Sequence, residues 1–487
     1  MRFTRKQACF FVLITFCKTS LSQLSAESLI YTTNEAVHYS SNPSCITIDQ
    51  EIESFVIRNI YIEGNKKTNP NIILRELPFQ VGENFTMEQI MEKFGKAKKN
   101  LMNSGLFREV EVSLKARSGE DVFVSIEVRE KWYVLPKPFL RTVDKNFKQW
   151  WQAGDRDMNR LNYGVRITHN NFTGRNDKVN LSIMNGYTRQ ISLQYYGLFL
   201  DNELKWSVNA GFSFGKNREL NYMTNANRPV ALKDDDYLRS YLSWFAELNY
   251  RPAIKTRHTI GIGYSYERVD DTIAKLNPSF ASSASIIRLP EVSYKMSYFD
   301  VDFIPYPTKG YVAELILRKK GFNDPVNLWQ LTAKGSRFLP VNEKYFLNLS
   351  AVGMVKLPFR QPYITHQFIG HDNQFMQGYE NYVVDGVAGG YAKATLTRPL
   401  LNTHLSLHSR KIDRLNHIPL KVFVKTFVNA GYIHSKYPGE NSLNNQLVYS
   451  GGIGLDIIAF TDFVIKIEWS FNRLGENGLY LHKRNYF

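Results

Sequence analysis

The end of the chain alternates apolar and polar residues with a period of two. From residue 463 to 472 apolar side chains take every second position, and Lys466, Glu468 and Ser470 lie between them. Successive side chains of a β-strand point to opposite faces, so this pattern predicts a strand with one apolar and one polar face. Similar segments recur from about residue 133 onward, almost without helical periodicity. The pattern favours a closed membrane barrel with its apolar face outward and its polar face inward.

The composition agrees with a membrane barrel rather than with membrane helices. Aromatic residues make up 14% of the 487 residues, which suits the aromatic girdles of such a barrel. The mean hydropathy is −0.32, and we find no run of about 18 apolar residues. The net charge of +16 comes from scattered basic residues, which favours lipid headgroups or a basic lumen over nucleic acid as their partner.

The N-terminus has the three parts of a secretory signal peptide. Basic residues precede an apolar stretch at residues 8–16, and small residues follow as far as Ser22. We therefore predict a signal peptide over residues 1–22 and a flexible polar lead-in over residues 23–54. A buried helix, or a lipoprotein cysteine at Cys17, is the less favoured alternative. Cys45 is the one cysteine left after cleavage, which excludes an internal disulfide.

Residues 55–131 are predicted to form a compact α+β unit with the order strand, helix, helix, strand, strand. That order resembles a POTRA domain, as does the segment Leu-Met-Asn-Ser-Gly-Leu-Phe at residues 101–107, which leads into the second strand. The second strand carries Phe107, Val110 and Val112 and is expected at the sheet edge. Such an edge would dock a client or an accessory lipoprotein by strand addition.

Residues 132–487 contain about sixteen candidate strands, from 133–142 to 479–487. The predicted fold class is therefore mainly β, a 16-stranded antiparallel transmembrane barrel preceded by one βααββ POTRA domain. A POTRA domain joined to such a barrel resembles the BamA/TamA superfamily of outer-membrane assembly and translocation proteins. The resemblance implies a bacterial outer-membrane location, with the POTRA domain in the periplasm.

One loop motif carries the resemblance further and also departs from it. The family has a Val-Arg-Gly-Phe/Tyr signature whose Arg pairs, inside the lumen, with the Asp of a Phe-x-Asp-x-Gly motif. This chain has Gln377, Gly378 and Tyr379 at the first motif and Asn429 at the second, so both charges are replaced by amides. We hypothesise that Gln377 and Asn429 hydrogen-bond and still tether the loop. Independent drift of the two positions is the alternative.

The first and last strands would meet at a barrel seam. We place this seam at Tyr133 and Leu135 on one side and at Leu479, Leu481 and Phe487 on the other. A weak seam exposes backbone groups with which a client strand can pair. This chemistry needs no catalytic residue, cofactor or metal.

The sequence therefore predicts a protein that inserts or translocates client proteins, and a specialised paralog of the general assembly barrel. Its expected partners are unfolded outer-membrane or surface proteins, periplasmic chaperones or accessory lipoproteins, and membrane lipid, but not nucleic acid. A passive channel or receptor barrel without a client is the alternative. A Gly-x-Ser-x-Gly match at residues 211–215 continues a strand pattern, so a hydrolase nucleophile is disfavoured. His366, His371 and Asp372 are expected on a loop surface rather than at a metal.

Overall fold

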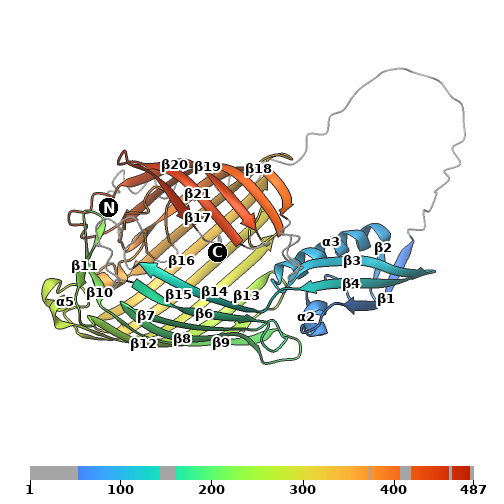
Figure 1. The fold of residues 1–487 in the computed structure, drawn as a ribbon, viewed down its shortest axis with the longest axis horizontal. Helices are drawn as coiled ribbons and strands as arrows, with labels where there is room; N and C mark the ends of the chain where they lie inside the picture. The colour runs from blue at the N-terminus through green and yellow to red at the C-terminus, as the bar shows by residue number, and fades with distance from the viewer. Residues whose placement is uncertain (1–52, 143–160, 372–373, 406–417, 460–462, 483–487) are drawn as a thin grey trace, which may run out of the picture. The chain divides into compact units, whose positions relative to one another are not determined.

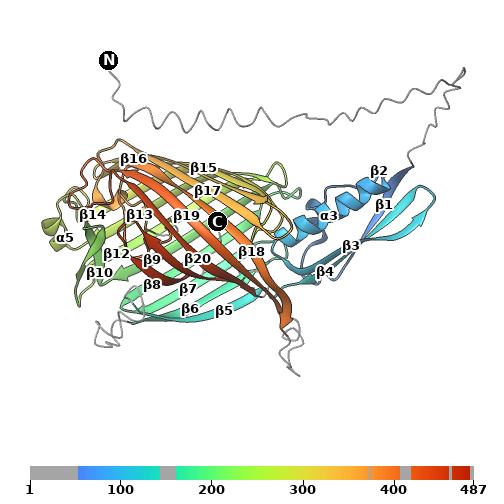
Figure 2. The same ribbon diagram turned by 90° about the horizontal axis from the view of Figure 1, so that it is seen from above.

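The computed structural model describes residues 53–142, 161–371, 374–405, 418–459 and 463–482. These residues form a small α+β domain and a 16-stranded antiparallel sheet that curves into a barrel (Figures 1 and 2). The predicted fold class is confirmed. The predicted signal peptide, residues 23–52 of the predicted lead-in, and Phe487 lie outside the described residues.

The small domain has the predicted order of strands and helices, with one additional short strand, β2. Its sheet has the order β2-β1-β4-β3, in which β1 and β4 are parallel and the other neighbours are antiparallel. Thr86 accepts a hydrogen bond from the backbone of Gln89 and completes the capping box of the longer helix. The elements are β1 (Ser54–Glu63), α2 (Pro70–Arg75), β2 (Asn84–Thr86), α3 (Met87–Asn103), β3 (Phe107–Ser118) and β4 (Asp121–Glu130).

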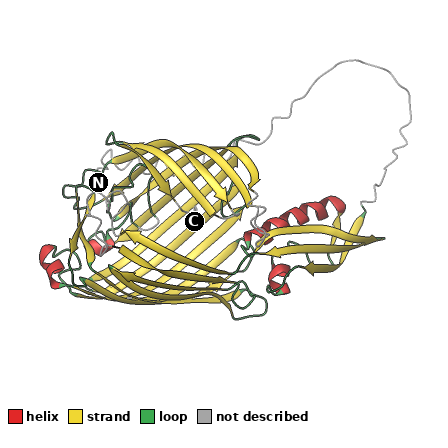
Figure 3. Cartoon of the chain, viewed as in Figure 1, coloured by secondary structure: helices red, strands yellow, loops and turns green. Residues whose placement is uncertain are grey.

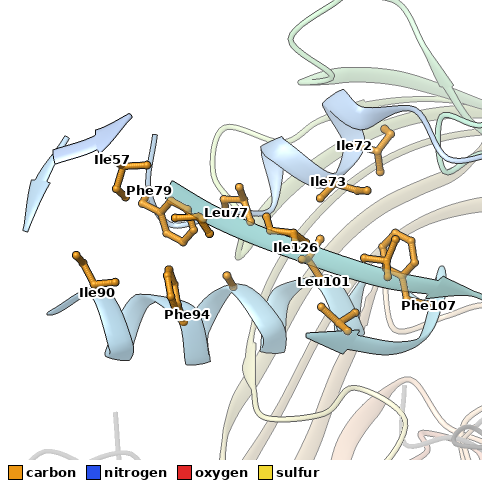
Figure 4. Close-up of a cluster of buried hydrophobic side chains, with 14 of the residues drawn as sticks. Ile57, Ile72, Ile73, Leu77, Phe79, Ile90, Phe94, Leu101, Phe107 and Ile126 are labelled. Carbon is orange, nitrogen blue, oxygen red and sulfur yellow. The ribbon is translucent and has the colours of Figure 1, made fainter. Parts of the chain in front are cut away.

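One side of α3 and the inner face of this sheet form the core of the small domain (Figure 4). Ile90, Phe94 and Leu101 recur at helical spacing on α3 and are buried, as one apolar face of a helix requires. Phe107 and Val110 of β3 are buried in the same cluster. Val112 packs partly buried against that cluster, and β3 lies at the sheet edge within the described residues, so docking there through the backbone stays a prediction.

The large sheet contains the sixteen predicted strands, each paired antiparallel with its neighbours. They are β5 (Val134–Thr142), β6 (Leu161–Asn170), β7 (Lys178–Gly186), β8 (Thr188–Phe199), β9 (Trp206–Asn217), β12 (Arg239–Tyr250), β13 (Thr256–Val269), β14 (Ile286–Val301), β15 (Gly310–Asn323), β16 (Val326–Pro340), β17 (Phe346–Leu357), β18 (Ala388–Leu405), β19 (Ile418–His434), β20 (Leu447–Ala459), β21 (Phe463–Asn472) and β22 (Asn477–His482).

The strands present polar side chains to the lumen and apolar side chains to the outside. On β21, Lys466 and Glu468 are buried, whereas Trp469 and Phe471 are exposed. This arrangement inverts that of a soluble barrel and matches a barrel whose outer surface meets lipid. The Gly-x-Ser-x-Gly segment at residues 211–215 lies within β9, so it is a strand and not a nucleophile turn.

A row of stacked aromatic rings crosses four neighbouring strands at one end of the barrel. Trp206 stacks on Tyr250 with ring centroids 4.4 Å apart, and Tyr250 is followed by His258 at 6.4 Å. Tyr294 continues the row and lies 6.2 Å from His258. Rings with one apolar body and one polar tip suit the boundary between lipid and water, and this row is what an aromatic girdle would require at one end of the barrel.

The longer connections contain elements that the sequence did not predict. A hairpin of β10 (Glu219–Asn225) and β11 (Arg228–Lys233) follows β9, and α5 (Asp271–Leu276) follows β13 (Figure 3). A short 3-10 helix, Tyr363–Thr365, lies in the connection after β17. Across the ranges described, the helices are all too short or too polar to cross a membrane.

Candidate functional site

The connection between β17 and β18 packs against the barrel wall as an internal hydrophobic cluster. Its side chains Phe368, Met376 and Tyr379 are buried together with Tyr391 of β18 and Ile433 of β19. On β19 the buried residues alternate with exposed ones such as Val428 and Tyr432, so the buried set faces the lumen. The loop that carries Gln377 therefore lies inside the barrel, as the family resemblance implied.

Gln377 and Asn429 do not hydrogen-bond to each other, which corrects the predicted amide pair. The Nε2 of Gln377 donates to Oε1 of Glu468 on β21 at 3.3 Å. The Nδ2 of Asn429 donates to Oγ of Ser450, its direct neighbour on β20, at 3.0 Å. Neither amide oxygen has a hydrogen-bond partner within the ranges described. Each amide is therefore held by its own partner.

A lysine of the barrel wall supplies the positive charge that the family signature places on the loop, where this chain has Gln377. The Nζ of Lys425 on β19 lies 2.5 Å from Oδ1 of Asp456 on β20 and 2.5 Å from Oε1 of Glu468. All three side chains are at most 1% exposed. Tyr306 donates a further hydrogen bond of 2.8 Å to Asp456. Because Lys425 already neutralises Glu468, a neutral Gln377 can contact that carboxylate without leaving it unpaired.

A glycine on the strand between them lets Lys425 reach Glu468. Lys425 lies opposite Gly454 of β20, and Gly454 lies opposite Glu468, so the two charges flank the glycine in one row of the sheet. A Cβ at Gly454 would lie 2.7 Å from the carbonyl oxygen of Ile467 and 3.1 Å from both the Cε of Lys425 and the Cγ of Glu468. The absence of a side chain at Gly454 therefore leaves room for the neighbouring backbone and for this ion pair.

The loop has further anchors around Gly378 and Tyr379. Asn472 donates to the carbonyl of Gly378 at 2.7 Å, and Tyr379 donates to the carbonyl of Tyr449 at 2.9 Å. Gly378 has a φ of +87°, and a Cβ there would lie 2.9 Å from Cβ of Ser450. Glycine is thus required by both the backbone and the close approach of the wall. The hydrogen-bond partners of the four predicted tether residues thus lie on β20 and β21.

The same loop also contacts the last described strand. Glu380 lies 3.2 Å from Nε2 of His482, and Asn381 donates to the hydroxyl of Tyr480 at 3.4 Å. Tyr382 donates to Glu476, in the turn before β22, at 2.7 Å. The loop therefore braces β22 from the luminal side.

The barrel sheet begins at β5 and ends at β22, and the described residues contain no pairing between these strands. The carbonyl of Tyr133 accepts from Asn170 of β6 at 2.7 Å. Tyr133 and, two positions on, Leu135 therefore direct their backbone groups toward β6 and not toward the seam. Leu135 lies on β5, the first strand of the sheet, and Tyr133 directly precedes that strand, so their place at the seam stays a prediction. Leu479 and Leu481 of β22 are 72% exposed and lie at the open end of the sheet.

A buried carboxylate joins the small domain to a barrel connection. Glu76, 4% exposed, accepts two hydrogen bonds from Arg251, at 2.6 and 2.8 Å, and pairs with Arg75 at 3.0 Å. Burial by itself raises the pKa of Glu76, but the hydrogen bonds and charges of the two arginines outweigh it and lower the pKa. Glu76 is therefore held as a carboxylate.

The site shows no metal centre within the ranges described, where no three His, Cys, Asp or Glu residues form a group able to bind an ion. His371 instead pairs with Asp385 at 2.8 Å, while Asp372 lies outside the described residues. The hydrogen bond and charge of His371 lower the pKa of Asp385 against the opposing effect of burial.

The architecture defines a barrel of the outer-membrane type with one POTRA-like domain. The model of the Omp85 superfamily domain matches residues 171–459, and the POTRA model, described as a surface antigen variable number repeat, matches residues 55–131. The chain belongs to the Omp85 superfamily.

Solved structures share this fold at low sequence identity. CdiB from Escherichia coli is 13% identical, with 89% of this chain and 75% of CdiB covered and a TM-score of 0.50. BamA from Haemophilus ducreyi, lacking POTRA domains 1–3, is 15% identical, with 88% and 83% covered and a TM-score of 0.48. No curated protein sequence matches the chain.

Proposed function

We propose that this protein inserts or translocates protein clients at a bacterial outer membrane. One observation carries the proposal: the barrel sheet has two end strands, β5 and β22, that do not pair with each other within the described residues. Unpaired strand edges template another strand, and in lipid a strand needs such pairing because its backbone groups find no water. A client strand that is added at this seam remains hydrogen-bonded while it enters the membrane.

The small domain would serve this function on the periplasmic side. Within the described residues β3 (Phe107–Ser118) ends its sheet and has a neighbouring strand on one side, and strand addition at the other side needs no side-chain pocket. Unfolded clients, periplasmic chaperones or an accessory lipoprotein are the partners that such an edge suits. A barrel that merely conducts solutes has no need of a docking edge.

The luminal loop would hold β20, β21 and β22 in fixed positions while a client is inserted or translocated. The anchors of Gln377 and Gly378 fix the loop to β20 and β21, and Glu380 links it to β22. The loop Arg of the family signature is replaced by Gln377, and Lys425 of the wall supplies the cation. We attribute this exchange to a specialised paralog that handles few clients.

Quantitative proteomics of outer membranes with and without the gene tests the proposal. We expect one or a few outer-membrane or surface proteins to be lost in the deletion and restored by the wild-type gene. A broad fall of all barrels would make the protein a general assembly factor. No change, with the protein folded in that membrane, would contradict the proposal and favour a channel or receptor.

A further inference from the structure

A row of cations crosses four neighbouring strands of the barrel near one of their ends. Arg189 of β8 lies opposite Lys216 of β9, and Lys216 lies opposite Ser240 of β12. Ser240 in turn lies opposite Arg268 of β13, so the four residues form one row across the sheet. Cross-strand neighbours in one row share a face of the sheet, so the three cations of this row point to the same side.

That side is the outer surface of the barrel. Ile191 and Phe214 lie two positions further along β8 and β9, opposite each other, and their apolar side chains are exposed. Leu193 and Phe212 repeat the arrangement another two positions along. Residues two apart in a strand share a face, so the cations border the apolar surface that would meet lipid.

The row lies at the end of β12 that is remote from the small domain. Ser240 is the second residue of β12, whereas Arg251, which directly follows the strand, pairs with Glu76 of the small domain. Tyr250 of the stacked aromatic row lies ten residues after Ser240. Ten strand residues rise about 33 Å, and a tilt of about 40° reduces this to about 25 Å along the barrel axis, the height of the apolar band of such barrels. With the small domain in the periplasm, the cations would be level with the headgroups of the outer leaflet.

One aromatic ring gathers three cations at this place. The ring belongs to Tyr237, in the connection between β11 and β12. The Cζ of Arg189, the Nζ of Lys216 and the Cζ of Arg218 lie 5.6, 5.7 and 5.1 Å from its centroid. Within the described ranges none of the three forms an ion pair, although exposed aspartates at residues 234–236 directly precede the tyrosine. Like charges this close repel each other, so an anion from outside the chain would stabilise the cluster.

We propose that this outward cluster binds the phosphorylated headgroup of an outer-leaflet lipid. Phosphate oxygens accept charge-assisted hydrogen bonds from guanidinium and ammonium groups. A lipid suits the site better than free phosphate, because its acyl chains would cover the apolar rows next to the cations. The row is also wide, since a strand spacing of about 4.8 Å puts the backbones of Lys216 and Arg268 about 10 Å apart, more than one phosphate spans. The leaflet depends on the location proposed above, but the binding holds whether or not the barrel has protein clients.

Native mass spectrometry of the full-length protein in a neutral detergent tests the proposal. The probe is lipid A with two phosphates, titrated in parallel with the same lipid freed of its phosphates and with inorganic phosphate. We expect the wild type to bind the phosphorylated lipid and neither of the others at the same concentration. Arg189→Gln with Lys216→Gln should weaken this binding by about tenfold or more, because two charge-assisted contacts are lost. Tyr237→Leu keeps every charge but removes the ring that gathers the cations, so it should weaken the binding as well.

Lys233→Gln with Lys275→Gln is the matched control. Both lysines are exposed and lie in connections at the same end of the barrel, outside the cluster, so the control removes the same charge. It should bind within about twofold of the wild type, because distant surface charges are screened by salt. An equal loss in the control, unchanged binding after Arg189→Gln with Lys216→Gln, or inorganic phosphate that binds as tightly as the lipid would each overturn the inference. If that double variant does not fold, Arg189→Gln alone, at an exposed residue, is judged by the same comparison.

Discussion

Replacing Lys425 by Met isolates the contribution of the luminal ion network. Lys425 contacts both Asp456 and Glu468 at 2.5 Å, and Lys466 lies opposite Asp456 on the adjacent strand. Met keeps the length and apolar character of the lysine stem but removes its charge. Glu468 then keeps its hydrogen bond from Gln377, a neutral amide, and its contact with the imidazole of His482.

The expected loss is large because the network is almost completely buried. Removing one partner of a buried ion pair destabilises a protein by about 3–5 kcal/mol, since the remaining charge is left uncompensated. We expect Lys425→Met to lose a free energy of unfolding in this range. The double variant Lys425→Met with Glu468→Gln removes one charge of each sign, while Asp456 keeps the hydroxyl of Tyr306 and lies opposite Lys466, so it should recover part of the loss.

Urea unfolding of the barrel in phospholipid vesicles, followed by tryptophan fluorescence, measures these free energies. Lys421→Met is the matched control, because Lys421 lies on the same strand and face but is exposed. It should change the free energy by less than about 1 kcal/mol, as surface charges do. A loss below about 1 kcal/mol for Lys425→Met, or an equal loss for Lys421→Met, would refute the role given to this lysine.

Three further perturbations follow from single contacts. Gly454→Ala places a Cβ 2.7 Å from the carbonyl oxygen of Ile467 and 3.1 Å from the side chains of Lys425 and Glu468, and should destabilise the barrel by about 1–3 kcal/mol in the same assay, whereas Gly335→Ala, whose Cβ meets no atom within 4 Å, should have little effect. Gly378→Ala strains a residue with positive φ by about 1–2 kcal/mol and should make the loop more accessible to protease, and an unchanged cleavage rate would contradict this. Glu76 has a folded-state pKa below its ordinary value of about 4.3, so its stabilisation is complete above that pH and is lost as the pH falls through the lower folded-state value. The difference in unfolding temperature between wild type and Glu76→Gln should therefore shrink in acid, and a difference that grows in acid would show the opposite sign.

The strands were predictable because each is a local pattern of alternation. The ten residues of β21 show this directly, since their polar members are all buried toward the lumen. The hairpin β10–β11 and α5 were not predicted, because they lie in long connections whose form depends on contacts with other loops. Asn277, after α5, donates to the carbonyl of Tyr222 in β10, and no local pattern encodes such a contact.

The luminal site was predicted only in outline. The loop and its glycine were found from the motif, but the direct pair of Gln377 and Asn429 was wrong. The partners are set by strand register, which places Ser450 opposite Asn429 and a glycine between Lys425 and Glu468. A signal was present, because Lys425, Asp456 and Glu468 all occupy the polar face of three successive strands. Predicting this ion network required the register between neighbouring strands as well as the alternation within each strand.

The most direct test of the central claim follows when a client reaches the cell surface after synthesis of this barrel begins. A protein lost from the outer membrane of the deletion strain would be labelled in cells depleted of this barrel, and synthesis of the barrel would then be induced. We expect the labelled protein to become surface-exposed only after induction, and more slowly with Lys425→Met than with Lys421→Met. Surface exposure at the same rate without the barrel would contradict the claim that this protein delivers clients to the outer membrane.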